Sequence, residues 1–197
     1  SINILQEIFY IRLMFMIRPK KVIKCSFIIY LKILYNPSVK NTYLSIISPK
    51  EENLTELLQK NLSDIEIELA QDGLIVFKTS LEPKIFTKIE PSIKTFFLIK
   101  KFDNLEGKYF KPMFQWASRH SFEQISDINK YFGFKSFRIV LKDKKKTLSG
   151  HRRAIKALEN KISKETNLTV NRVNPDTEIW IVHTSQGYGF IIFKITK

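Results

Sequence analysis

Residues 135–197 constrain the fold most, because their apolar pattern changes from the period of a strand to that of a helix and back. The stretch "SFRIVLK" alternates as a half-buried strand does, and "SGHRRAIKALENKISKET" then repeats at helical spacing. A second strand, "LTVNRV", follows the helix, and "TEIWIVHTS", "QGYG" and "FIIFKIT" read as a hairpin. The pattern predicts a sheet that is covered by a helix on one face.

The predicted helix of this segment has signals at both ends. Ser149 is expected to be its N-cap, and Asn167 can adopt the left-handed conformation that ends a helix. Its apolar residues share one face, which we expect to pack on the sheet. They are Ala154, Ile155, Leu158 and Ile162.

The part of the chain before this segment predicts a second α/β unit. "YLSII" alternates as a strand, and a helix with Ser48 as N-cap and Pro49 in its first turn is expected after it. "IEIEL" and "LIVFKT" flank an Asp-Gly turn and predict a hairpin, which a short helix and a closing strand follow. A further short helix is expected in "SFEQISDINKYFG". The predicted organisation is an extension (1–40), an α/β domain (41–105), a connector (106–134) and a C-terminal domain (135–197).

Charge is distributed very unevenly along the chain. The formal net charge is +14, and residues 130–164 hold twelve Lys and Arg against two acidic residues. Residues 51–107 hold seven basic and eleven acidic residues. Such a concentrated excess of positive charge favours a polyanionic partner, either nucleic acid or an anionic membrane surface.

The basic block surrounds the predicted helix start, where free backbone N–H groups and a partial positive charge favour phosphate. Arg152 and Lys156 are four residues apart and should project into solvent, with Arg153 beside them. A solvated helix face is the competing interpretation. Aromatic residues are not interleaved with these cations, and Phe132, Phe134 and Phe137 are expected in the core. Contacts to the nucleic-acid backbone and to its shape are therefore expected, rather than base readout.

The C-terminal segment contains a motif made of Val170, Asn171, Pro175, Asp176, Glu178, Ile179 and Trp180. With this motif it resembles a THUMP domain, the RNA-binding module of several RNA-modifying enzymes. The preceding α/β unit is similar to the ferredoxin-like segment that precedes THUMP in SAM-dependent RNA methyltransferases. The resemblance implies tRNA as the partner, and it implies that Asp176 and Trp180 stabilise the fold. The implied RNA-binding residues are Lys142, Lys144, Lys145, Lys146, His151, Arg152, Arg153, Lys156 and Arg172.

The sequence contains no recognisable motif for a catalytic, metal-binding or cofactor-binding site. Cys25 is the only cysteine, and the three histidines (His120, His151 and His183) lack metal-ligand spacing. The Gly-Tyr-Gly stretch lies in a predicted hairpin, and no glycine-rich loop follows a strand as a SAM-binding domain requires. We therefore expect no catalytic, metal or cofactor site, and S-adenosylmethionine only together with a methyltransferase domain. The lone cysteine favours a reducing compartment, most simply the cytoplasm.

The overall prediction is an α+β protein with a ferredoxin-like N-terminal domain and a C-terminal THUMP domain. It would bind structured RNA as the substrate-recognition part of a methyltransferase, and the chain would be a fragment or a natural truncation. Three alternatives stay open: an enzyme with an unrecognised site, a general nucleic-acid- or DNA-binding protein without a link to methylation, and a membrane-surface protein. The last would use the apolar and basic residues 1–35 as an amphipathic anchor, since no uncharged run there is long enough to cross a bilayer.

Overall fold

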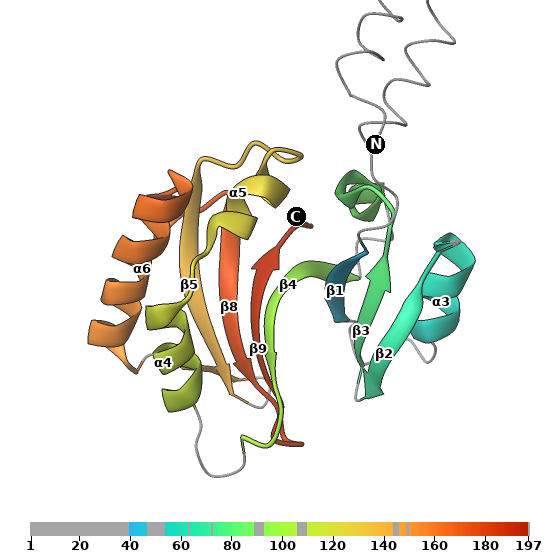
Figure 1. The fold of residues 1–197 in the computed structure, drawn as a ribbon, viewed down its shortest axis with the longest axis horizontal. Helices are drawn as coiled ribbons and strands as arrows, with labels where there is room; N and C mark the ends of the chain where they lie inside the picture. The colour runs from blue at the N-terminus through green and yellow to red at the C-terminus, as the bar shows by residue number, and fades with distance from the viewer. Residues whose placement is uncertain are drawn as a thin grey trace, which may run out of the picture. The chain divides into compact units, whose positions relative to one another are not determined.

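The computed structural model describes most of one compact unit, Lys40–Lys197 (Figure 1). Predictions for the extension before Lys40, for the cap at Ser48, and for Lys144 and Lys145 lie outside the described residues. The described residues are 40–46, 54–62, 64–71, 73–88, 93–105, 110–143, 146–148 and 150–196.

The first half of this unit has the connectivity β-α-β-β-helix-β. Its strands are ordered β2-β3-β1-β4, and every neighbouring pair is antiparallel. This is the ferredoxin-like arrangement, with a short 3-10 helix in the place of the second α-helix. The elements are β1 (Asn41–Ile46), α3 (Leu54–Asn61), β2 (Glu66–Gln71), β3 (Leu74–Thr79), η1 (Pro83–Lys88) and β4 (Lys94–Phe102).

The second half adds a βαβ unit and a hairpin. Strands β5 and β8 are parallel, α6 lies between them in the chain, and β8 and β9 form the predicted antiparallel hairpin. Asn167 ends α6 in the left-handed conformation, as predicted. The elements are α4 (Lys111–Arg119), α5 (Glu123–Asn129), β5 (Ser136–Asp143), β6 (Lys146–Leu148), α6 (Arg152–Thr166), β7 (Thr169–Val170), β8 (Thr177–His183) and β9 (Gly189–Lys194).

Strand β4 joins the two halves into one sheet. Residues 94–97 pair with β1, and residues from Phe96 to Phe102 pair with β9, with a bulge between Leu98 and Lys100. The described strands form a nine-stranded sheet in the order β2-β3-β1-β4-β9-β8-β5-β6, with β7 also pairing with β5. One sheet contains strands from the predicted α/β domain (41–105) and from the predicted C-terminal domain (135–197). The predicted domain boundaries at residues 105 and 135 stay predictions.

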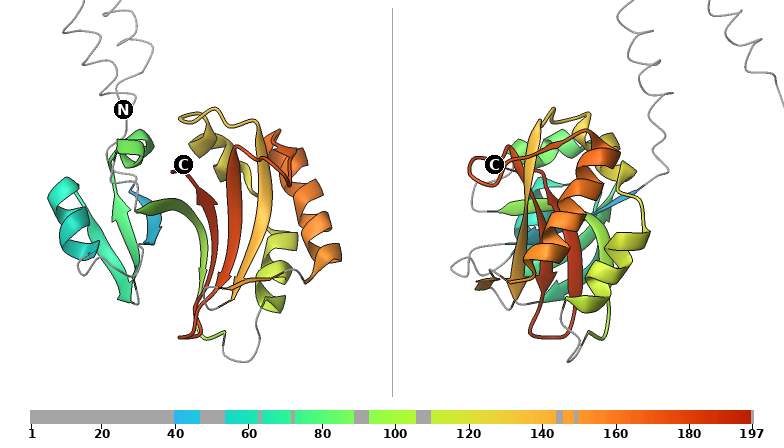
Figure 2. Two further views of the ribbon diagram at one scale, coloured as in Figure 1. Left: turned by 180° about the vertical axis from the view of Figure 1, so that it is seen from behind. Right: turned by 90° about the vertical axis from the view of Figure 1, so that its left-hand side faces the viewer.

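Helices α4 and α6 lie beside β5 at one end of the sheet, and α3 lies beside β2 at the other end (Figures 1 and 2). All described helices nevertheless pack on the same face of the strands. The larger hydrophobic core lies there and includes a buried side chain from every described helix. These side chains are Leu58 of α3, Phe86 of η1, Met113 of α4, Ile125 of α5 and Ile162 of α6. A second, smaller cluster lies on the opposite face of the strands and contains Leu44, Phe96, Phe190 and Ile192.

Four details differ from the prediction. The predicted connector contains α4, whose buried Met113 and Ala117 lie one turn apart. The last residue of the lysine run, Lys146, begins the strand β6, which pairs with the end of β5, and lysine is common on such edge strands. The strand expected in "LTVNRV" is only Thr169–Val170. The N-cap of α6 is His151 rather than Ser149, because the chain enters the helix through a left-handed residue.

Candidate nucleic-acid interface

Helix α6 presents a cationic face to solvent. Leu158 and Ile162 are buried against the sheet, as the helical period predicted. Arg152, Arg153 and Lys156 are exposed, and none of them forms an ion pair with another described residue. These three residues, called the α6 basic face below, are the part of the predicted RNA-binding set that the structure brings together.

Both carboxylates of α6 are already used by other groups. Glu159 is buried, with 3 % of its side chain exposed, and it forms a two-fold hydrogen-bonded ion pair with Arg172. Glu165 accepts a hydrogen bond from the backbone N–H of Phe122 at 2.8 Å and lies 3.8 Å from Lys161 Nζ. The positive charge of the α6 basic face therefore has no carboxylate of its own helix to neutralise it.

None of the described side chains caps the N-terminus of α6. His151 occupies the N-cap position with φ of 63°, and its side chain accepts no capping hydrogen bond. Its ring lies against Phe110 and Phe114 instead, with centroids 5.8 and 5.7 Å away. The first-turn N–H groups thus lack the side-chain acceptor that Ser or Asp supplies, and they add to the positive potential beside Arg152 and Arg153.

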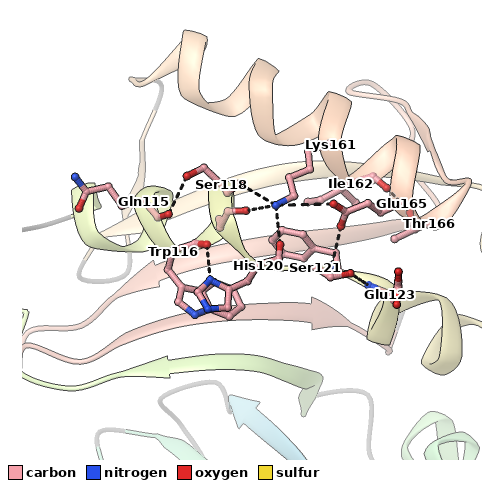
Figure 3. Close-up of polar contacts among 12 residues, drawn as sticks. Gln115, Trp116, Ser118, His120, Ser121, Glu123, Lys161, Ile162, Glu165 and Thr166 are labelled. Carbon is pink, nitrogen blue, oxygen red and sulfur yellow. Dashed lines mark hydrogen bonds and ion pairs between the residues drawn. The ribbon is translucent and has the colours of Figure 1, made fainter.

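Helix α4 runs beside α6 in the same direction. Phe114 near its start contacts His151, and the carbonyl oxygens near its end accept hydrogen bonds from Lys161 of α6 (Figure 3). Two helix N-termini therefore lie at the same end of the layer. The exposed Lys111 lies at the first residue of α4. Because parallel helix dipoles add, this end of the layer carries more positive potential than α6 would alone.

Lys142 does not join the α6 basic face, although it belongs to the predicted RNA-binding set. It lies in β5, where its Nζ donates to Thr147 Oγ1 at 2.6 Å and sits 4.9 Å from the centroid of the Trp180 ring. Trp180 packs with the cluster on the helix-free face, whereas α6 packs on the other. The strand continues to Asp143, and its alternation turns the Lys142 side chain away from α6. The assignment of Lys142 to RNA binding stays a prediction.

The remaining predicted RNA-binding residues differ in what the structure says of them. Lys146 lies in β6, and its side chain is not described. Arg172 is 62 % exposed, but its guanidinium group is held by Glu159. His151 is exposed at the start of α6. The site assignment for each of these residues stays a prediction.

The motif residues Asp176 and Trp180 stabilise the fold, as the resemblance implied. Asp176 Oδ2 accepts hydrogen bonds from the backbone N–H groups of Lys135 and Ser136 at 2.8 and 2.9 Å, and these bonds hold its pKa below the ordinary value. Trp180 Nε1 donates to Glu178, which also pairs with Arg138. Burial opposes ionisation of Glu178, but these hydrogen bonds outweigh it and lower its pKa.

Metal binding and membrane crossing find no support in the described part of the chain. No group of three or more His, Cys, Asp or Glu side chains there could hold a metal ion. His183 pairs with Asp143 at 2.9 Å, without a third such group. No described helix is both long enough and apolar enough to span a bilayer.

Comparison with known proteins finds similarity of structure only. No protein-family model and no curated protein sequence matches the chain. Eighteen chains of solved structure resemble it. TrmN from Thermus thermophilus aligns with a TM-score of 0.54 and 12 % identity over 79 % of this chain. A predicted N6-adenine-specific DNA methylase from Listeria monocytogenes aligns at 0.50 and 10 % identity over 89 %. A 4-thiouridine synthetase in complex with RNA and ATP aligns at 0.45 and 16 % identity over 79 %, covering 41 % of that protein.

The similarity establishes the fold. The predicted α+β class with a mixed sheet is confirmed by the strand pairing and by the alignment with TrmN. The chain spans less than half of each of these three proteins: 46 % of TrmN, 43 % of the methylase and 41 % of the synthetase. Activity, substrate and partners therefore have to be argued from this chain's own residues.

Two features of the site were missed by the sequence analysis. Lys111 was placed in the connector, so its position beside the α6 N-terminus was not anticipated. Lys161 was not singled out, although it binds the end of α4. Pro112 in the first turn of α4, with Met113 and Ala117 at helical spacing, was the available signal for this helix.

Proposed function

We propose that this protein binds structured RNA, with tRNA as the first candidate, through the α6 basic face. The observation that carries the proposal is the set of three exposed cations on a helix whose two carboxylates are both occupied. Phosphate oxygens are suited to this arrangement, because Arg and Lys neutralise them while the uncapped helix N-terminus supplies N–H donors. The resemblance to a THUMP domain points to the same helix.

The proposal extends to the biological role. This protein would be the substrate-recognition part of a SAM-dependent RNA methyltransferase whose catalytic domain lies outside the sequence considered. Two findings support it: the THUMP-like motif, and the shared fold with a protein named as a methylase. S-adenosylmethionine would bind to the catalytic domain, so equilibrium dialysis of this chain alone should detect none. The single cysteine suits action in the cytoplasm.

The decisive experiment is fluorescence anisotropy with a tRNA transcript over a series of salt concentrations. The variant Arg152→Ala/Arg153→Ala/Lys156→Ala should bind more weakly, and its log–log salt slope should be shallower by roughly 2 to 3, one counterion for each lost phosphate contact. The matched control is Lys60→Ala/Lys84→Ala/Lys88→Ala, which removes the same charge from exposed positions of α3 and η1. It should bind tRNA almost as wild type does.

Two other ligands separate the proposal from its alternatives. Duplex DNA of matched charge should bind more weakly than tRNA, and vesicles of anionic lipid should not compete. Equal affinity for all polyanions, or an equal effect of both triple variants, would reduce the α6 basic face to general electrostatics. Binding to vesicles alone would favour a membrane-surface protein instead.

A further inference from the structure

Trp116 and His120 form a stacked aromatic pair at the end of α4. Their ring centroids are 4.4 Å apart and their planes differ by only 13° (Figure 3). Phe102 and Phe122 meet the Trp116 ring edge-on, with interplanar angles of 87° and 83°. His120 is exposed, while Trp116 is only partly exposed. The exposed His120 ring is therefore stacked on the Trp116 ring, and Phe102 and Phe122 hold the Trp116 ring in place.

The His120 ring is fixed in orientation as well as in position. Its Nδ1 lies 2.9 Å from the carbonyl oxygen of Trp116. A carbonyl oxygen can only accept a hydrogen bond, so Nδ1 carries the hydrogen and Nε2 of the neutral ring is left as an acceptor. A ring held in this way loses little conformational freedom when a ligand stacks on it.

The charges around the pair suit a nucleic acid. Lys161 lies beside it, although its ammonium group is occupied by backbone carbonyls (Figure 3). Arg119 and Lys164 are exposed and form no ion pair with another described residue. Glu165 is held by Lys161 and by Phe122. The pair also belongs to the same helix layer as the α6 basic face, because α4 and α6 run side by side.

We propose that the Trp116–His120 pair is a stacking platform for an unpaired base of a single-stranded RNA segment. An RNA whose paired region contacts the α6 basic face would place a single-stranded end or loop on His120. Stacking tolerates any base, because every base has a π-face, and His is among the side chains that RNA-binding proteins use for it. The proposal rests on RNA binding by α6. It adds a second contact, which recognises that a base is unpaired rather than which base it is.

The test compares two RNA hairpins that differ only in an unpaired 3′ tail. Wild type should bind the tailed hairpin more tightly. His120→Ala should weaken binding of the tailed hairpin about tenfold and leave the blunt hairpin unchanged. His120→Phe keeps a flat ring and should restore most of the affinity. The triple variant of the α6 basic face should weaken binding of both hairpins alike.

A second readout identifies the platform directly. In ¹H–¹⁵N spectra, the indole N–H resonance of Trp116, assigned by its loss in Trp116→Phe, should shift when a short single-stranded oligonucleotide is added. The resonance of Trp180 should stay in place. The inference is overturned if the tail adds no affinity, if His120→Ala affects both hairpins equally, or if only the Trp180 resonance shifts. In each of these cases, binding of the blunt hairpin would still support the proposed function. A wild type that binds neither hairpin overturns both proposals.

Discussion

Lys161 and Glu165 lie one turn apart on α6, where Lys161 binds the end of α4 and Glu165 binds the start of α5. Lys161 Nζ donates to the carbonyl oxygens of Ala117, Ser118 and His120 at 3.0, 3.0 and 2.7 Å. Glu165 accepts from the backbone N–H of Phe122 at the start of α5. A cation thus meets the negative end of one helix and an anion meets the positive end of the next, which is the favourable sense for both.

Replacing Lys161 by Met should destabilise the protein by about 1–2 kcal/mol, because the carbonyl groups at the end of α4 lose a charged donor. The methionine keeps most of the apolar stem, so packing changes little. Urea denaturation would measure the loss. Lys164→Met is the matched control, since Lys164 is exposed one turn further along α6 and has no partner among the described residues. Equal losses in the two variants would show that the three hydrogen bonds contribute nothing.

The features that the sequence predicted well are those set by local periodicity. Leu158 and Ile162 were expected to be buried and are, because a helix of this length fixes its own buried face. The two hairpins were also expected, since Asp-Gly and Gly-containing turns between apolar runs determine them. The exposed positions of Arg152 and Lys156 follow directly from the same helical period.

The features that the sequence did not reveal depend on pairing between distant strands. No local sequence signal in β4 indicates that this strand pairs with both β1 and β9. The direction of Lys142 could have been inferred, because Leu141 is apolar and alternation then turns Lys142 to the opposite face. The Trp116–His120 pair needed α4, which lay in the predicted connector.

Gly189 should be intolerant of any side chain. A Cβ atom there would lie 2.3 Å from Leu105 Cδ1 and 2.8 Å from Met113 Sδ, and both of these side chains are buried. Gly189→Ala should therefore cost about 1–3 kcal/mol of stability, as overpacking does. Gly150→Ala is the control, because a Cβ atom at Gly150 has nothing within 4 Å. Thermal unfolding that ranks the two variants equally would contradict the close approach of α4 to β9.

The stability that Asp176 provides should depend on pH. Its pKa is lowered in the folded protein, from an ordinary value of 3.8, by hydrogen bonds from Lys135 and Ser136. A lowered pKa means that this contribution is present above the ordinary value and is lost as the pH falls through the folded value. Asp176→Asn should therefore unfold at a lower temperature than wild type at neutral pH. The difference should shrink as the pH falls below 3.8.

Scanning calorimetry at several pH values would measure this difference. Glu178 also has a lowered pKa and stays in both proteins, so the comparison between them isolates Asp176. A gap in unfolding temperature that stays constant from neutral to acidic pH would mean that the carboxylate charge is not what the two N–H groups recognise.

Arg172 and Glu159 should respond unequally to mutation, because Glu159 is 3 % exposed whereas Arg172 is 62 % exposed. Arg172→Ala leaves a buried carboxylate without its partner and should therefore destabilise the protein more than Glu159→Gln does. Glu159→Gln leaves an arginine that water can reach, and it should cost about 1–3 kcal/mol. The double variant should lose less than the sum of the two, since the residues share one interaction.

The same variants decide whether Arg172 contacts RNA, as the resemblance implies. Glu159→Gln frees the guanidinium group without removing it, so a protein that uses Arg172 for phosphate should bind tRNA at least as tightly after this change. If Arg172 acts only within the fold, Glu159→Gln should leave affinity unchanged. Arg172→Ala should then weaken binding only at temperatures where the variant begins to unfold. Anisotropy measured well below the unfolding midpoint of each variant separates an RNA contact from a structural ion pair.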